Sequence, residues 1–317
     1  MEIVVLDGFA LNPGDLSWEG LKQLGKCQVY DRTKPADIFD RIKNAAVVIT
    51  NKSVLDQQVI DRLPHLRYIG VTATGYNVVD VQAASRKEIV VTNIPAYSTD
   101  SVAQLVFSHI LNVANRVEMH ATSVASGEWV QSPDFAYWKS PQMELAGKTL
   151  GIVGFGRIGR KVAQIGLAFG MKVIFNNRSK IIDAPVEMHQ LTLEEVCAQS
   201  DVLSINCPLS QENAAFVNQQ LLQTMKPSAI LVNTGRGGLV NESDLANALN
   251  SGVIAAAGLD VLSTEPPKPD NLLLFAKNCF ITPHIAWATL EARQRLMNIT
   301  VENLQCFISG NAQNVVK

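Results

Sequence analysis

The chain has 317 residues, with 27 Lys or Arg and 29 Asp or Glu, and its formal net charge is −2. This length is sufficient for two domains that each bury a core. The near-neutral charge argues against nucleic acid as a partner, because proteins that bind it usually carry a basic face. The start MEIVVLDGFA lacks the basic segment of a secretory signal, and no apolar run reaches the ~18 residues of a membrane span. We therefore expect a cytoplasmic protein that is not attached to a membrane.

The cysteines and histidines indicate neither disulfides nor a metal site. The five cysteines are scattered and no CxxC pair occurs, which is typical of reduced thiols. The five histidines are also dispersed, without the spacing of metal ligands. We predict no bound metal.

Short β-type runs alternate with helical stretches along the whole chain. The first group of runs is EIVVLD, AAVVIT, LRYIGV and IVVTNIP, and the second is TLGIVGFG, KVIFNN, VLSINCP, AILVNTG, AAGLDV and CFITPH. Many are continuously apolar, which indicates strands of parallel sheets that helices cover on both faces. We predict an α/β fold with two Rossmann-like, doubly wound parallel-sheet domains.

Helical connections are expected between the strands, for example over 212–225 and 242–251. The second of these begins after Asn241 and has Glu242 and Asp244 in its first turn, which suits a helix N-terminus. The segment 99–127 has helical periodicity, contains no proline and is longer than one domain needs. We favour a role for it in subunit contact; the alternative is a buried helix followed by a surface helix.

The stretch TLGIVGFGRIGRKVAQIGLAFGMKVIFNN predicts a strand, a glycine turn, a helix and a second strand. Gly154, Gly156 and Gly159 fit the G-x-G-x-x-G pattern of dinucleotide-binding proteins. In that pattern the glycines allow a tight turn, close approach of a pyrophosphate and close packing of helix on strand. The helix N-terminus then supplies N–H groups to the anion. We predict a dinucleotide site here.

Charged residues follow three later strands. Arg236 lies in NTGRGGLV, Asp260 and Glu265 in LDVLSTEPP, and His284 in TPHIAWAT. Because ligands of open α/β sheets bind outside the carboxyl ends of the strands, these residues are expected to converge. Taken singly, each also fits a surface arginine, a solvated glutamate or a buried histidine, but together they favour a catalytic site.

The motifs GFGRIG, NTGRGGLV, LDVLSTEPP and TPHIAWAT occur in the order found in the D-isomer-specific 2-hydroxyacid dehydrogenase family, which the chain resembles over essentially its whole length. The resemblance implies a flavodoxin-like substrate-binding (catalytic) domain formed by residues 1–99 and 287–317. It also implies an inserted NAD(P)-binding Rossmann domain over 100–286. A homodimer formed through the 99–127 region is the family expectation.

The resemblance also implies catalytic roles that agree with the chemistry of the side chains. Arg236 would bind the substrate carboxylate through its planar donors. His284 would donate a proton to the 2-oxo oxygen as hydride reaches the carbon, and Glu265 would orient the imidazole. Asp260 would hold the carboxamide end of the nicotinamide.

Further contacts follow from the matching motifs. The expected cofactor-binding residues are Thr99, Gly154, Phe155, Gly156, Arg157, Ile158, Gly159, Asn177, Arg178, Ser179, Cys207, Pro208, Thr234, Gly235, Asp260 and Ala286. The expected substrate-binding residues are Lys52, Ala73, Thr74, Gly75, Arg236 and Trp287. For Lys52 an ordinary surface lysine is the simpler interpretation, residues 73–75 also fit a plain strand and turn, and Trp287 also fits a packing aromatic.

The residues FNNRSK bear on the choice of cofactor. An acidic residue usually ends the second strand of such a site and binds the ribose hydroxyls, but this chain has Asn177 there. Arg178 and Ser179 are suited to a 2′-phosphate, although Arg178 also fits a side chain that points into solvent. We predict NAD(H) or NADP(H), with NADP(H) favoured.

The motifs ATGYN and HIAWAT, with Trp287 next to the catalytic segment, are most similar to the hydroxypyruvate reductase (glycerate dehydrogenase) and glyoxylate reductase branch. This similarity predicts reduction of hydroxypyruvate or glyoxylate to D-glycerate or glycolate. The alternatives are a D-lactate-type or 3-phosphoglycerate-type dehydrogenase, or a cofactor-sensing binding protein that resembles the corepressors of the family.

Overall fold

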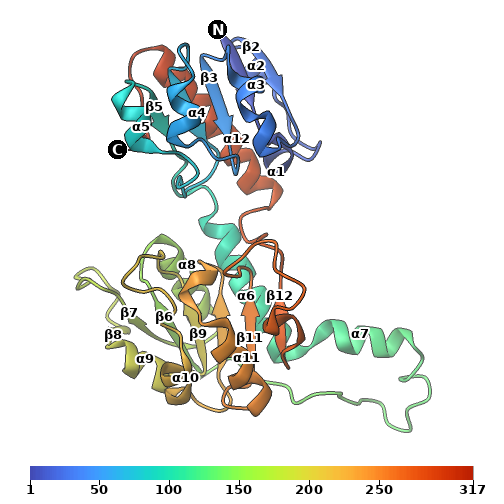
Figure 1. Ribbon diagram of the computed structural model, residues 1–317. Coiled ribbons are helices and arrows are strands. Elements are labelled where there is room, and N and C mark those ends of the chain that lie inside the picture. Colours follow the sequence, from blue (N-terminus) through green and yellow to red (C-terminus); the bar gives the residue numbers. More distant parts are fainter. Residues whose placement is uncertain (317) are drawn as a thin grey trace. The chain divides into compact units, whose positions relative to one another are not determined.

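The computed structural model describes residues 1–316, which divide into two compact units (Figure 1). Unit 1 consists of Met1–Ser98 together with the segment from Ala288 onward, and unit 2 is Thr99–Trp287. Unit 2 is therefore inserted into the sequence of unit 1, and each unit has its own sheet and core.

Unit 1 contains a five-stranded parallel sheet. Its strands are β1 (Glu2–Val5), β2 (Lys26–Val29), β3 (Val47–Thr50), β4 (Tyr68–Val71) and β5 (Val90–Thr92). The spatial order is β2-β1-β3-β4-β5, which is the order of flavodoxin-like folds. The strand order reverses between β1 and β3, and the ends of these two strands are where such folds bind ligands.

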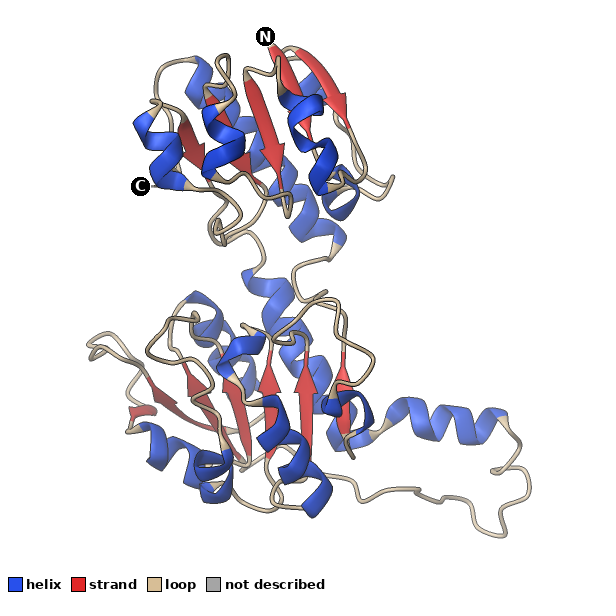
Figure 2. Cartoon of the chain, in the orientation of Figure 1, coloured by secondary structure: helices blue, strands red, loops and turns tan. Residues whose placement is uncertain are grey.

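Helices cover both faces of this sheet (Figure 2). They are α1 (Gly8–Leu11), α2 (Glu19–Lys22), the 3₁₀ helix η1 (Pro35–Asp37), α3 (Ile38–Ile42), α4 (Gln57–Asp61), α5 (Val81–Arg86) and α12 (Leu290–Ile308). The carboxylates of Asp56 and Asp80 cap α4 and α5 by accepting hydrogen bonds from the backbone of Val59 and Ala83. On one face α3, α4 and α5 pack on the strands, and on the other α2 and α12 do so.

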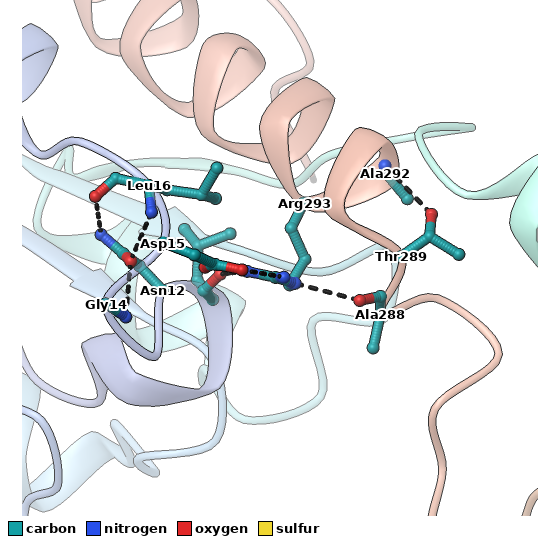
Figure 3. A network of polar contacts seen from close by, with 9 residues as sticks. Asn12, Gly14, Asp15, Leu16, Ala288, Thr289, Ala292 and Arg293 are labelled. Atoms are coloured by element: carbon teal, nitrogen blue, oxygen red, sulfur yellow. Dashed lines mark hydrogen bonds and ion pairs between the residues drawn. The ribbon is translucent and has the colours of Figure 1, made fainter.

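The last helix is joined to the start of the chain by an ion pair (Figure 3). Both terminal nitrogens of Arg293 in α12 lie 2.6 Å from the two carboxylate oxygens of Asp15. Arg293 also donates through Nε to the carbonyl of Ala288 at 3.0 Å. The guanidinium holds the pKa of Asp15 below its usual range. Such two-point pairing fixes orientation as well as distance, so residues near Asp15 and the N-terminal end of α12 are held in one arrangement.

Unit 2 contains a seven-stranded parallel sheet. Its strands are β6 (Thr149–Val153), β7 (Lys172–Asn176), β8 (Met188–Gln190), β9 (Val202–Ile205), β10 (Ile230–Asn233), β11 (Ala256–Leu259) and β12 (Cys279–Ile281). The spatial order is β12-β11-β10-β9-β6-β7-β8, so the strand order reverses between β6 and β9, as in Rossmann folds. The prediction of two doubly wound parallel sheets is confirmed.

The helices of unit 2 also cover both faces of its sheet. They are α6 (Thr99–Asn115), α7 (Val117–Ala125), α8 (Arg157–Ala168), α9 (Leu193–Gln199), α10 (Gln219–Thr224), α11 (Glu242–Ser251) and the 3₁₀ helices η2 (Gly237–Leu239) and η3 (Leu272–Phe275). On one face α6 and α8 pack on the strands, and on the other α9, α10 and α11 do so. The predicted start of α11 is confirmed, because Asn241 caps it by accepting from Asp244 N. Within the described residues, no helix combines the length and apolar character needed to cross a membrane.

One helix prediction was partly wrong, and for a second the alternative interpretation is confirmed. The helix expected over 212–225 is limited to α10, because Val217 instead forms a parallel bridge to Val240 and donates its N–H to Leu239 O at 3.1 Å. The helical segment expected over 99–127 consists of the largely buried α6 and the exposed α7, as in the alternative of a buried helix followed by a surface helix, and the break lies at Arg116, whose backbone is left-handed with φ 48°. The Arg116 guanidinium lies over the Phe280 ring at 4.6 Å and donates to Asn278 Oδ1 at 3.0 Å, which favours the break.

Candidate active site

The glycine turn joins β6 to α8 at the point where the strand order of unit 2 reverses. Gly154 has φ +93°, and a Cβ there would lie 2.6 Å from Cys207 N, so both its conformation and its surroundings require glycine. A Cβ on Gly159 would lie 2.2 Å from Gly154 O, so this glycine lets α8 pack against the turn. These are the roles that the pattern predicts for its first and third glycines.

Gly156 differs from Gly154 and Gly159, because a Cβ on Gly156 would have no atom within 4 Å. It is the N-cap residue of α8, it is exposed, and no side chain caps the helix. Arg157, Ile158 and Gly159 form the first turn, whose N–H groups lack partners within the helix. The open space beside these donors fits a pyrophosphate.

The end of β7 is tied to the glycine turn by an amide side chain. Asn177 Oδ1 accepts the backbone N–H of Phe155 at 3.1 Å, and Asn177 Nδ2 donates to Ser179 O and Ser179 Oγ at 3.1 Å each. The Phe155 ring stacks on Phe175 of β7, with ring centroids 3.9 Å apart. Arg178 and Ser179 are exposed. The structure thus brings Asn177 and Ser179 together beside the turn.

Buried polar atoms without partners lie at the ends of β9 and β10. Among the described residues, Asn206 Oδ1 and Thr234 Oγ1 are buried and have no hydrogen-bond partner. The backbone of Cys207 lies against Gly154, and burial raises the pKa of the Cys207 thiol, which keeps it protonated. Pro208 is exposed, whereas Gly235 donates its N–H to Asn233 Oδ1 at 3.0 Å. An unpaired buried polar atom can accept a hydrogen bond from a ligand or an ordered water; sequence reasoning missed Asn206.

His284 follows β12 and pairs with Glu265, which follows β11. His284 Nδ1 lies 2.6 Å from Glu265 Oε2, while Glu265 Oε1 accepts the N–H of Leu262 at 3.1 Å. Because a carboxylate only accepts hydrogen bonds, Nδ1 carries the proton of this contact, and Nε2 is left to exchange a proton with another molecule. The structure thus brings the two residues together as a hydrogen-bonded pair.

Asp260 holds the segment that carries His284. Its side chain accepts from Thr282 Oγ1 at 2.6 Å, Ile285 N at 2.9 Å and Ala286 N at 2.8 Å, and the residue is 1% exposed. His284 has φ 54°, and its N–H donates to Asp260 O at 2.9 Å. A left-handed non-glycine residue costs roughly 1–2 kcal/mol, so these bonds maintain an unfavourable backbone conformation. This anchoring role was not predicted.

A second histidine, His109, joins the hydrogen bonds around Asp260 through Thr282. His109 of α6 is 4% exposed, and its Nε2 lies 3.2 Å from Thr282 Oγ1. Because Thr282 donates its own proton to the Asp260 carboxylate, His109 Nε2–H is the donor toward Thr282. Burial lowers the pKa of His109, and the charge of Asp260 opposes this shift. Only its position on the buried side of a helix distinguished His109 in the sequence, and that position fits an ordinary core residue equally well.

The remaining unit 2 candidates occupy strand ends or the start of α6. Arg236 is exposed after β10, and its Nη1 donates to Gly235 O at 2.8 Å. Ala286 is buried, and its carbonyl accepts from Ser101 Oγ at 2.5 Å. Trp287 is the last residue of the unit and Thr99 begins α6, and both are partly buried.

In unit 1, Lys52 lies just after β3 on a segment that is bound by Asp7. The Asp7 carboxylate accepts the consecutive N–H groups of Asn51, Lys52 and Ser53 at 2.7, 2.6 and 2.7 Å. Asp7 follows β1, so this contact lies at the reversal point of the unit 1 sheet. The backbone that carries Lys52 is therefore fixed, while its side chain is exposed.

Residues 73–75 follow β4 in the same unit. Ala73 O accepts from Ile94 N at 3.0 Å, Thr74 Oγ1 donates to Ile94 O at 2.9 Å, and Asn93 Nδ2 donates to Thr74 O at 2.8 Å. Within residues 1–316, the backbone N–H groups of Thr74 and Gly75 have no hydrogen-bond partner. The loop is thus held by its carbonyls and presents two N–H groups.

Comparison with known proteins agrees with these features. A family model described as the NAD binding domain of D-isomer-specific 2-hydroxyacid dehydrogenases matches residues 107–286. A hydroxypyruvate reductase of Blautia hydrogenotrophica is 48% identical, covering 100% of this chain and 99% of that protein. A glycerate dehydrogenase of Methylorubrum extorquens is 38% identical, covering 91% of each protein.

Among solved structures, the NADPH-dependent glyoxylate/hydroxypyruvate reductase from Sinorhizobium meliloti, in complex with NADP and malonate, is similar. Its TM-score is 0.83 at 29% identity, and the match covers 99% of this chain and 96% of that one. A relative that is 48% identical over the full chain and a family model that matches more than half of it confirm what the motifs predicted. The chain belongs to the D-isomer-specific 2-hydroxyacid dehydrogenase family.

Proposed function

We propose that the protein uses NAD(P)H to reduce a short 2-oxo acid, hydroxypyruvate or glyoxylate, to D-glycerate or glycolate. The observation that carries this proposal is the His284–Glu265 pair, with 2.6 Å between Nδ1 and Oε2. His284 and Glu265 follow strands of the same parallel sheet as the glycine turn. The carboxyl ends of parallel strands lie at one edge of a sheet. A proton donor and a dinucleotide site at one edge suit hydride transfer to a carbonyl.

The chemistry then divides among a few side chains. The nicotinamide supplies the hydride when it is bound. Arg236 binds the carboxylate of the 2-oxo acid with its planar guanidinium. His284 Nε2 gives a proton to the oxygen that becomes the hydroxyl, and Glu265 stabilises the charged imidazole by accepting from Nδ1.

Unit 1 is proposed to recognise the substrate, and unit 2 to bind the cofactor. Within unit 1 the N–H groups of Thr74 and Gly75 are suited to a carboxylate, because consecutive backbone donors form anion-binding sites. Lys52 and Trp287 are further candidates for substrate contact. The relatives from Blautia hydrogenotrophica and Methylorubrum extorquens, named as a hydroxypyruvate reductase and a glycerate dehydrogenase, support a three-carbon substrate.

NADP(H) is the cofactor that we favour. The chain has Asn177 where a carboxylate would repel a 2′-phosphate, and Arg178 and Ser179 follow it as exposed donors. The relative from Sinorhizobium meliloti is named as NADPH-dependent, which agrees with this choice. Arg178→Ala should raise the KM for NADPH more than the KM for NADH in steady-state assays. An unchanged ratio of the two KM values would contradict the role of Arg178.

The test of the activity is absorbance at 340 nm with the purified protein and both reduced nicotinamides. Hydroxypyruvate, glyoxylate, pyruvate and 3-phosphohydroxypyruvate form the substrate panel. The highest kcat/KM should be found with hydroxypyruvate or glyoxylate. A preference for pyruvate or the phosphorylated acid would favour the lactate-type or phosphoglycerate-type enzyme, and no oxidation with any acid would refute the enzymatic function.

The homodimer expected through the 99–127 region is proposed to form instead through the arm, residues 117–144, because α6 (Thr99–Asn115) is packed into the core of unit 2. Figure 1 shows α7 and the segment after it extending away from the sheet of unit 2. The arm exposes large apolar side chains, including Val130 at 90%, Phe135 at 94% and Trp138 at 73%. Monomeric proteins rarely expose so many large apolar residues in one segment, so a second copy of the chain is the expected partner.

A further inference from the structure

One glutamine organises the loop that follows β7. Gln190, the last residue of β8, donates from Nε2 to Asn177 O at 3.1 Å and to Ser179 O at 3.0 Å. Its Oε1 accepts the N–H of Ile181 at 2.9 Å. A single partly buried side chain therefore makes hydrogen bonds to three alternate residues of the loop. Nothing in the proposed chemistry requires this residue.

These bonds determine which way the peptide groups of the loop point. In a planar trans peptide the C=O and the following N–H point in opposite directions. Because the carbonyls of Asn177 and Ser179 point toward Gln190, the N–H groups of Arg178 and Lys180 point away from it. The side of the loop opposite Gln190 therefore presents donors, and the two carbonyl oxygens, which would repel an anion, are turned away from that side.

The side chain of Asn177 makes the Ser179 hydroxyl available as one more donor on the loop. Its Nδ2 donates to Ser179 Oγ at 3.1 Å, so the serine oxygen acts as acceptor and the hydroxyl proton is left for another partner. The loop is also fixed to the glycine turn by the N–H of Phe155, which donates to Asn177 Oδ1 at 3.1 Å. The donors near Arg178 are thus held in place before any ligand binds.

We propose that Gln190 is a positioning residue for cofactor choice, which orients the 177–181 loop to bind the 2′-phosphate of NADP(H). The inference rests on the proposed use of NADP(H). Without the Gln190 amide the Asn177 carbonyl loses its only partner among the described side chains. The Asn177 carbonyl is then free to rotate toward the phosphate, and the Ser179 carbonyl keeps only the Asn177 Nδ2 contact at 3.1 Å, so that binding of the phosphate has to order the loop again. The 5′-phosphate and adenine contacts do not depend on these bonds.

The test compares binding of 2′,5′-ADP and 5′-AMP by calorimetry, because the two probes differ only in the 2′-phosphate. Gln190→Met keeps the length of the side chain and removes all three hydrogen bonds. The expected result is a loss of about tenfold in affinity for 2′,5′-ADP, the equivalent of one or two net hydrogen bonds, with less than a twofold change for 5′-AMP. Gln199→Met, on an exposed glutamine at the end of α9, is the matched control and should leave both affinities unchanged.

Kinetics provide the second readout. For Gln190→Met the KM for NADPH should rise about tenfold while kcat at saturating NADPH and the KM for NADH stay within about twofold, a pattern that general loss of stability does not produce. If Gln190→Met does not fold, Gln190→Asn retains an amide that is one methylene too short to reach all three backbone groups. An unchanged ratio of the two probe affinities in the folded variant overturns the inference. If the wild-type protein binds 5′-AMP as tightly as 2′,5′-ADP, the proposed use of NADP(H) is itself wrong, and the inference falls with it.

Discussion

Replacing Gly156 by alanine separates cofactor binding from folding more sharply than any other change in the glycine turn. The added methyl group meets no protein atom within 4 Å, and the backbone at φ −81° and ψ −160° is extended, which alanine tolerates. The smaller entropy of the unfolded chain favours alanine by about 0.4–1 kcal/mol, and the poorer N-cap costs a similar amount. The free energy of unfolding should therefore change by less than about 1 kcal/mol.

Cofactor binding should respond very differently, because the methyl group enters the space beside the first N–H groups of α8. A pyrophosphate that is displaced from one of these donors loses a charge-assisted hydrogen bond of about 1.5–3 kcal/mol, which corresponds to a roughly 10- to 100-fold rise in Kd. Calorimetric titration with NADPH measures the Kd, and thermal unfolding without cofactor measures the effect on the fold.

Gly159→Ala serves as the contrast. Its methyl group would lie 2.2 Å from the backbone oxygen of Gly154, so α8 has to move, at a cost on the order of 3 kcal/mol. Gly156→Ala should thus bind the cofactor more weakly and keep its melting temperature. Gly159→Ala should bind the cofactor more weakly and also have a lower melting temperature. A Gly156→Ala protein that is fully folded and binds NADPH as tightly as the wild type would refute the placement of the pyrophosphate.

Three further predictions concern other parts of the molecule. His284→Ala should bind NADPH normally and lose about 10²- to 10⁴-fold in kcat, measured at 340 nm, because it lacks the proton donor. The double variant Val130→Asp, Trp138→Asp should be monomeric by light scattering, since charges on the exposed arm disfavour apolar contact. His109→Gln, which keeps a donor toward Thr282 and cannot be protonated, should lose less stability on acidification than the wild type. Burial lowers the pKa of His109 below the 6.5 of the unfolded chain. Below about pH 6.5 the unfolded chain therefore binds a proton at this histidine more readily than the folded protein does, and the free energy of unfolding falls.

Each of these has an outcome that contradicts it. Normal turnover of His284→Ala would remove His284 from proton transfer. A wild-type protein that is already monomeric, or an arm variant that stays dimeric, would exclude the arm as the contact. Parallel curves of unfolding free energy against pH for His109→Gln and the wild type would show that His109 does not take part in the acid response; urea titrations at pH 5, 6 and 7 measure those curves.

The central strands and the edge strands β5 and β12 could be predicted from the sequence, but the edge strands β2 and β8 could not. Central strands such as β3 and β9 are buried along their whole length, so their continuous apolar runs identify them. Strand β2, with sequence KCQV, alternates exposed and half-buried residues, and β8 has only three residues, MHQ. Both lie at sheet edges, where pairing to a neighbour and not burial defines the strand. The break at Arg116 also depends on a distant contact, with Phe280 and Asn278, that no local signal reports.

For the candidate site, strict spacing and side-chain chemistry mark the residues of the glycine turn and the His284–Glu265 pair in the sequence. The supporting residues Gln190, His109 and Asp7 carry no such mark. Each acts through hydrogen bonds to backbone or to a neighbouring side chain, so its importance depends on where its neighbours lie. A glutamine at the end of an edge strand looks like any surface residue until the loop it binds is known.

The insertion of unit 2 into unit 1 also has a consequence for synthesis on the ribosome. The N-terminal segment emerges first, yet its core contains Leu304 of α12, and Tyr68 of β4 packs against Phe307 with ring centroids 4.9 Å apart. Its strand β5 also pairs with Val315, near the end of the chain. Unit 2 is complete before α12 has been translated, so the unit that is begun first is finished last. Until then the nascent chain exposes one apolar face of the unit 1 sheet, and this face has to be protected from aggregation while unit 2 is made and folds.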